Sequence, residues 1–146
     1  MKKSTGSSTK RDAFIDTSGF YAILVKDDPL HAKANEILAH AKRRTIRFVT
    51  TDYILDETAT LLTSRRRGHL VAGLFDRVLA SKACRVEWMD PVRFDETRQF
   101  FLKHHDQPWS FTDCFSFCVM NALGLRGALT GDVHFRHAGF QALLVG

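Results

Sequence analysis

The sequence predicts a single α/β domain in which helices cover both faces of a central, mostly parallel β-sheet. Three observations support one soluble domain of this class. Short apolar runs rich in β-forming residues alternate with longer stretches of helical period. The chain has 146 residues, which suits one domain, and 45% of them are hydrophobic, which is enough for a core. No stretch approaches the roughly 20 uncharged apolar residues that a membrane span needs, so we expect a soluble, cytoplasmic protein.

The first half of the chain begins with a polar, basic segment. Residues 1–12 have almost nothing to bury, and we expect a disordered basic tail before a folded domain at 13–146. The apolar run AFIDTS predicts the first strand, and a helical period follows over about 29–44. The run IRFVT predicts the next strand, and DYILDETATLLTSRR predicts the helix after it.

The second half of the chain continues the same alternation. A helical segment after Gly68 leads to the strand CRVEWM, and helices follow over about 91–105 and 110–123. The runs GALTG and QALLV predict the last two strands. A parallel sheet of this kind binds its ligands beyond the carboxyl ends of its strands.

Two aspartates stand at predicted carboxyl ends of strands. Asp16 follows Phe14 and Ile15 in the first strand, and Asp132 follows residues 129–131 of a later one. A single aspartate in such a position usually only caps the next helix or turn. Two of them at the ligand edge of one sheet favour a shared functional site.

Glu57 lies on a predicted helix. It shares a face with Ile54, Thr58 and Leu61, so we expect it to belong to the buried stripe, whereas Asp56 falls on the more polar side. A carboxylate at the helix edge, with a packed stem and a solvated head, explains the pattern equally well.

Asp113 lies in the first turn of the apolar segment SFTDCFSFCVMNAL. Ser110 and Asp113 form an S-x-x-D box, which satisfies free amides at the helix start. This capping role is compatible with metal binding, because the carboxylate has a second oxygen to offer.

Four carboxylates at one edge would repel one another unless a positive charge lies between them. A hard divalent cation supplies that charge, and oxygen ligands suit Mg²⁺ or Mn²⁺, whereas zinc would need a His and Cys spacing that the chain lacks. His134 and His137 are three residues apart, and we interpret them as surface histidines. An acidic metal site of this kind suits phosphodiester hydrolysis.

Basic residues form two local clusters, although the net charge of +5 owes much to the tail. Such clusters are typical of nucleic-acid contacts, but basic residues at helix C-termini also stabilise the helix dipole. The clusters are Lys42, Arg43, Arg44 and Arg47, and Arg65, Arg66 and Arg67.

The order of five segments resembles PIN-domain ribonucleases, especially the VapC-type toxins of toxin-antitoxin pairs. The resemblance covers residues 13–146 and lies in FIDTSGFYAIL, DDPLHAKANEIL, TTDYILDETATLL, SFTDCFSFCVM and ALTGDVHF. It implies a three-layer α/β/α fold and an endoribonuclease that uses Mg²⁺ or Mn²⁺ and leaves a 5′ phosphate. It also implies a homodimer that is blocked by a cognate antitoxin protein.

The resemblance assigns roles to particular residues. Asp16, Glu57, Asp113 and Asp132 take the acidic catalytic and metal-binding positions, with Asp16 and Asp113 as the most direct ligands. Supporting hydroxyls would come from Thr17, Ser18, Ser110 and Thr130, and the RNA backbone would contact Arg43, Arg44, Arg47, Arg65, Arg66 and Arg67.

Other hypotheses stay open at this stage. The chain could be a free-standing RNA-processing nuclease, which the neighbouring reading frame would distinguish from a toxin. It could also be a catalytically idle PIN scaffold that binds RNA or protein, although such a scaffold has no reason to keep four repelling acids. A phosphoacceptor receiver-like domain fits less well, because it needs paired acids after the first strand. Trp109 could stack on a base, but packing in the core is the better explanation.

Overall fold

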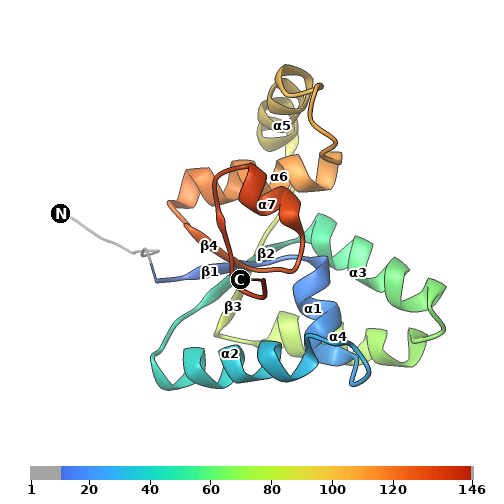
Figure 1. Ribbon diagram of the computed structural model, residues 1–146. Coiled ribbons are helices and arrows are strands. Elements are labelled where there is room, and N and C mark those ends of the chain that lie inside the picture. Colours follow the sequence, from blue (N-terminus) through green and yellow to red (C-terminus); the bar gives the residue numbers. More distant parts are fainter. Residues whose placement is uncertain (1–10, 146) are drawn as a thin grey trace.

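A computed structural model of the protein describes residues 11–145 and shows a five-stranded sheet between two layers of helices (Figure 1). Residues 1–10 of the predicted tail lie outside the described residues. Arg11 and Asp12, which the prediction places in that tail, contact the body: Arg11 donates a hydrogen bond to the Arg44 carbonyl, and Asp12 accepts one from the Arg47 amide.

The sheet is parallel throughout, in the order β3-β2-β1-β4-β5. Its strands are β1 (Ala13–Ile15), β2 (Phe48–Thr51), β3 (Cys84–Glu87), β4 (Gly127–Leu129) and β5 (Gln141–Ala142). The prediction of a central parallel sheet in a three-layer fold is confirmed. Because β1 and β4 are neighbours with Ile15 paired to Leu129, the residues that follow them lie side by side at one edge.

Helices cover both faces of the sheet (Figure 1): α1, α2 and α4 lie on one side, and α6 and α7 lie on the other, with α5 farther out and packed against α6. The helices are α1 (Thr17–Leu24), α2 (His31–Arg43), α3 (Asp52–Ser64), α4 (Val71–Ala80), α5 (Pro91–Lys103), α6 (Phe111–Leu123) and α7 (Val133–His137), with a 3-10 turn η2 (Gly68–Leu70) before α4. Helix α3 extends from the carboxyl edge of the sheet, beside the start of α1.

Helices α1 and α7 are absent from the predicted elements. Helix α1 has only eight residues, most of them buried and apolar, so its sequence reads as a continuation of the first strand. Helix α7 has five residues, which is too few for a helical period. Each of them begins directly after an aspartate cap, Asp16 for α1 and Asp132 for α7.

An aromatic core fixes α6 and α7 on the sheet. Phe135 of α7 packs against Phe14 of β1 and Phe117 of α6, with ring centroids 6.2 and 5.0 Å apart. Trp109 is buried, stacks on Phe100 and meets Phe117 edge-on at 5.1 Å. The indole therefore packs in the core, in line with the preferred interpretation of Trp109.

Candidate metal centre

Asp16 lies at the centre of the carboxyl edge of the sheet. It follows β1 and caps α1, and its Oδ1 accepts hydrogen bonds from the Gly19 amide (2.9 Å) and the Ser18 hydroxyl (2.8 Å). Thr130 follows β4, and its hydroxyl donates to Asp16 Oδ2 at 2.7 Å. The register of β1 and β4 creates this contact, because Asp16 and Thr130 directly follow the paired residues Ile15 and Leu129.

Burial makes the charged form of Asp16 costly. The residue is only 4% exposed, and burial raises the pKa of its carboxyl group from 3.8 to about 7. The hydrogen bonds from Thr130, Gly19 and Ser18 oppose this rise, and the nearby charge of Asp132 adds to it. A cation beside Asp16 would compensate the buried charge.

Asp132 is held at the turn after β4. Its carboxylate caps α7 by accepting from the His134 amide at 2.9 Å, and its own amide donates to the Thr130 hydroxyl at 2.9 Å. The Gly131 amide donates to the Ser18 hydroxyl at 2.9 Å. The hydroxyls of Ser18 and Thr130 therefore connect the turn that carries Asp132 to the carboxylate of Asp16.

Asp113 reaches the same edge from α6. Because α6 leads into the parallel strand β4, the amino end of the helix lies beside the carboxyl end of the strand. Ser110 and Asp113 form the predicted capping box, with both reciprocal hydrogen bonds present. Asp113 Oδ2 also lies 3.2 Å from Nδ1 of His134.

Asp113, Asp132 and His134 form a compact group, with one ligand atom of each within 4.8 Å of the others. His134, interpreted as a surface residue, is only partly exposed: its side chain is 29% exposed, and its Nδ1 lies 3.5 Å from Asp132 Oδ1. The short helix α7 turns the imidazole toward the carboxylates, and a helix of this length leaves no periodic signal in the sequence. His137, by contrast, is exposed.

Glu57 approaches the site from α3. The expectation that it shares the buried stripe is wrong, because Glu57 is exposed, as Asp56 is. Its Oε1 nevertheless accepts a hydrogen bond from the Thr17 hydroxyl at 2.5 Å, next to Asp16 along the chain. Glu57 therefore lies at the solvent side of the edge that holds Asp16.

Hydrogen bonds and close contacts link Asp16, Asp132 and Asp113, and Glu57 joins them through Thr17, the residue that follows Asp16 along the chain. Thr17 connects Glu57 to the start of α1, Thr130 connects Asp16 to Asp132, and His134 connects Asp132 to Asp113. Most of the possible metal ligands are carboxylate oxygens. Asp16 is the least exposed of these carboxylates, and its charge is not compensated when it ionises. This chemistry fits a hard divalent cation.

The two basic clusters lie toward opposite edges of the sheet. Arg43, Arg44 and Arg47 precede β2, so they lie at the amino edge of the sheet, away from the carboxylates. Arg65, Arg66 and Arg67 follow α3, which extends from the carboxyl edge (Figure 1).

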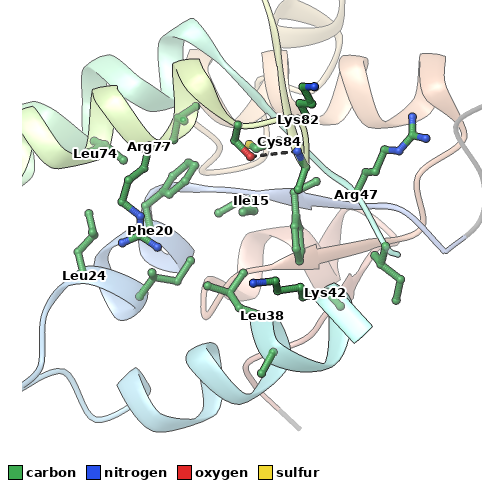
Figure 2. A pocket seen from close by; sticks show the side chains of 18 of the residues that line it. Ile15, Phe20, Leu24, Leu38, Lys42, Arg47, Leu74, Arg77, Lys82 and Cys84 are labelled. Atoms are coloured by element: carbon green, nitrogen blue, oxygen red, sulfur yellow. Dashed lines mark hydrogen bonds between the residues drawn. The ribbon is translucent and has the colours of Figure 1, made fainter. Parts of the chain in front are cut away.

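A cavity of about 640 Å³ lies between α1, α2, α4 and the sheet (Figure 2). Its wall is largely apolar and includes Phe20, Leu38 and Leu74. The charged residues that line it are all basic, namely Lys42, Arg47, Arg77 and Lys82. None of the four acids lines this cavity, so it is separate from the metal centre.

Comparisons with known proteins agree with the fold. Residues 13–141 match the PIN domain family. The 23S rRNA-specific endonuclease VapC20 of Mycobacterium tuberculosis is 32% identical over 127 residues, which are 87% of this chain and 94% of the relative. The crystal structure of Mycobacterium tuberculosis VapC20, described as a Sarcin-Ricin loop cleaving toxin, matches with a TM-score of 0.77 and 30% identity, over 88% of this chain and 96% of that one.

The chain therefore belongs to the PIN-domain family, and it is an endoribonuclease of the VapC type. Nucleases of this family use divalent metal ions, and the acidic group at the carboxyl edge is the place where the described residues could hold one. Within residues 11–145, none of the helices has the length and apolar character needed to cross a membrane.

Proposed function

We propose that the protein is the toxin of a toxin-antitoxin pair and that it hydrolyses RNA phosphodiester bonds at Asp16, Glu57, Asp113 and Asp132 with Mg²⁺ or Mn²⁺. The convergence of Asp113, Asp132 and His134 beside the buried Asp16 is the observation that carries this proposal. A free-standing nuclease would show the same geometry, whereas an idle scaffold would have no use for the buried charge.

Each residue has a distinct task in this proposal. When bound, the cation would activate a water molecule and neutralise charge on the phosphate and the leaving oxygen. Asp16, Asp113 and Asp132 would hold the cation, and Glu57 would bind on the solvent side. Thr130 and Ser18 fix the orientation of Asp16, while Ser110 fixes Asp113, so the carboxylates are ordered before the cation arrives.

A structured ribosomal RNA loop is the first substrate to test. VapC20 is a 23S rRNA-specific endonuclease, and its crystal structure is that of a Sarcin-Ricin loop cleaving toxin. The similarity covers nearly the whole of both chains. We therefore propose that this protein also cuts ribosomal RNA, at a loop rather than in a helix.

Cleavage of purified ribosomal RNA tests the proposed function directly. We expect cleavage with Mg²⁺ or Mn²⁺, none with EDTA, and a loss of at least about 100-fold in Asp113→Asn and Asp132→Asn, because each variant removes a cation ligand. Asp76→Asn, at an exposed position on α4, is the matched control. Equal cleavage by all variants would identify a contaminating nuclease and reject the assignment of the site.

His134 is expected to orient the carboxylates. Replacing it in His134→Ala removes the contacts with Asp113 and Asp132, and we expect cleavage to fall about 10- to 100-fold, as for other groups that position metal ligands. The exposed His137→Ala on the same helix should leave cleavage unchanged. A His134→Ala protein with full activity at low cation concentration would show that the imidazole has no such role.

The apolar cavity supports the proposal of an antitoxin partner. Lys42 and Arg77 extend toward the cavity, whereas Arg47 and Lys82 are directed away from its centre (Figure 2). A partner segment with apolar side chains and flanking acidic residues would match both the lining and the charge of its rim. A gene for such a small acidic protein beside this one would distinguish the toxin from a free-standing nuclease.

A homodimer and a cytoplasmic location stay predictions. Exposed apolar side chains near the amino end of α5, those of Trp88, Val92 and Phe94, supply a surface that a second copy could cover. Sedimentation of the purified protein would measure the oligomeric state.

A further inference from the structure

Tyr21 organises two arginines at the end of α3. The guanidinium carbon of Arg65 lies 5.0 Å from the centroid of the Tyr21 ring, in a cation-π contact. The guanidinium groups of Arg65 and then Arg67, close to the Tyr21 hydroxyl, lower its pKa against the effect of burial. The two guanidinium groups are thus gathered around one buried tyrosine of α1, which is 8% exposed.

The positive charge of this cluster is only partly compensated. Arg67 lies 3.4 Å from Asp27, whose side chain is 84% exposed, and a pair so open to water contributes little. Arg67 Nε is buried and has no hydrogen-bond partner among the residues that the structure describes. An anion could therefore bind here without displacing a strong internal ion pair.

Arg66 differs from its two neighbours. Its backbone is left-handed, with φ at 60°, its side chain is exposed, and Tyr21 contacts only the arginines on either side of it. A favourable interaction with the dipole of α3 would involve all three arginines. The helix dipole therefore does not explain why Tyr21 contacts only Arg65 and Arg67, and it does not explain why Arg67 Nε has no hydrogen-bond partner among the described residues.

The cluster and the metal centre both lie toward the carboxyl edge of the sheet. Helices α1 and α3 both begin at the carboxyl edge and contact each other, at Thr17 with Glu57 and farther along at Tyr21 with Arg65. Four residues of α1 and eight of α3 correspond to about 6 and 12 Å of helix. An RNA strand whose scissile phosphate lies at the carboxylates can therefore reach the arginines with a nearby phosphate.

We propose that Arg65 and Arg67, held in place by Tyr21, bind a backbone phosphate of the RNA a few nucleotides from the scissile bond. The acidic centre repels RNA, so positive charge at this distance offsets the repulsion and positions the strand. The inference rests on the proposed function, and it assigns a positioning role to two of the six arginines predicted to contact RNA.

The test measures KM and kcat of Arg65→Gln and Arg67→Gln, together with the Kd for a fluorescein-labelled, mixed-sequence single-stranded RNA in the Asp113→Asn background. We expect KM and Kd to rise about 5- to 10-fold with kcat unchanged, because the lost contact is to a phosphate that does not react. The slope of log Kd against log salt should fall by about 0.7 for each arginine removed. Tyr21→Phe should raise KM about 2- to 3-fold, since the ring remains and only the hydroxyl is lost.

Two further variants decide between a built site and general attraction. Lys103→Gln, at an exposed position on α5, controls for the loss of one charge. Arg66→Gln removes the same charge from the same turn and should raise KM less than either neighbour. An equal effect of Arg66→Gln, a fall in kcat with constant KM, or wild-type affinity in Arg65→Gln and Arg67→Gln would each overturn the inference. If the wild type cuts no RNA, the proposed function fails, and the Kd values still decide whether the cluster binds RNA.

Discussion

Asp16→Asn should abolish RNA cleavage and, in the absence of a divalent cation, make the protein more stable. Cleavage should fall at least about 100-fold because the variant removes a proposed cation ligand. Stability should rise because burial raises the pKa of Asp16 to about 7, so ionisation at higher pH costs the folded state up to about 4 kcal/mol. Asparagine keeps the size and the contact with the Gly19 amide but carries no charge. After the altered hydrogen bond to Thr130, we expect a net gain of roughly 2–3 kcal/mol at pH 8.

The dependence of stability on pH provides the measurement. The folded protein keeps the proton of Asp16 up to about pH 7, whereas the unfolded chain releases it near the ordinary value of 3.8. The folded state thus binds more protons between these values, and the free energy of unfolding of the wild type in EDTA should fall as the pH rises from about 4 to 7. Urea unfolding of wild type and Asp16→Asn over this range measures the difference.

Two comparisons separate this effect from a general change in charge. Added Mg²⁺ or Mn²⁺ should restore the stability of the wild type at pH 8 and leave Asp16→Asn unchanged, because only the wild type keeps the full ligand set. Asp56→Asn, at an exposed position on α3, should change neither cleavage nor the pH dependence. Parallel pH profiles of wild type and Asp16→Asn in EDTA would contradict the raised pKa.

The fold and the acidic edge could be predicted because both depend on local patterns. The alternation of strands and helices fixed the class of sheet, and strands that end in an aspartate placed Asp16 and Asp132 at one edge. The capping box at Ser110 was visible for the same reason, because three residues along one helix suffice to define it.

The features that the sequence did not reveal depend on contacts between distant segments. His134 joins the carboxylates only because α7 turns it toward α6, and Glu57 is exposed although Ile54 and Thr58 on the same face are buried. The periodicity of a helix shows which residues share a face, but it does not show which neighbour covers that face. The contact of Tyr21 with Arg65 was hidden for the same reason, since α1 itself was not recognised.

Helix α1 approaches β4 so closely that only glycine fits at position 19. A Cβ atom at Gly19 would lie 2.0 Å from the Leu129 carbonyl oxygen and 3.0 Å from Ile15 Cγ2. The Leu129 oxygen belongs to the backbone of a central strand, so α1 itself would have to move away from the sheet. That movement would weaken the hydrogen bond from the Gly19 amide to Asp16 and disturb the metal centre.

Gly19→Ala should therefore lower the free energy of unfolding by about 3 kcal/mol or more, through overpacking against an immovable backbone. Gly73→Ala is the matched control, because Gly73 also lies in the first turn of a helix, α4, and a Cβ there meets nothing within 4 Å. The control should be more stable than the wild type by about 0.5–1 kcal/mol, since alanine favours helix. Thermal unfolding of the two variants measures these opposite signs, and an insoluble Gly19→Ala beside a soluble Gly73→Ala would carry the same meaning. Equal melting temperatures would show that α1 does not depend on this close approach, and Asp16 would then owe its position to Thr130 and Ser18 rather than to the packing of α1 on β4.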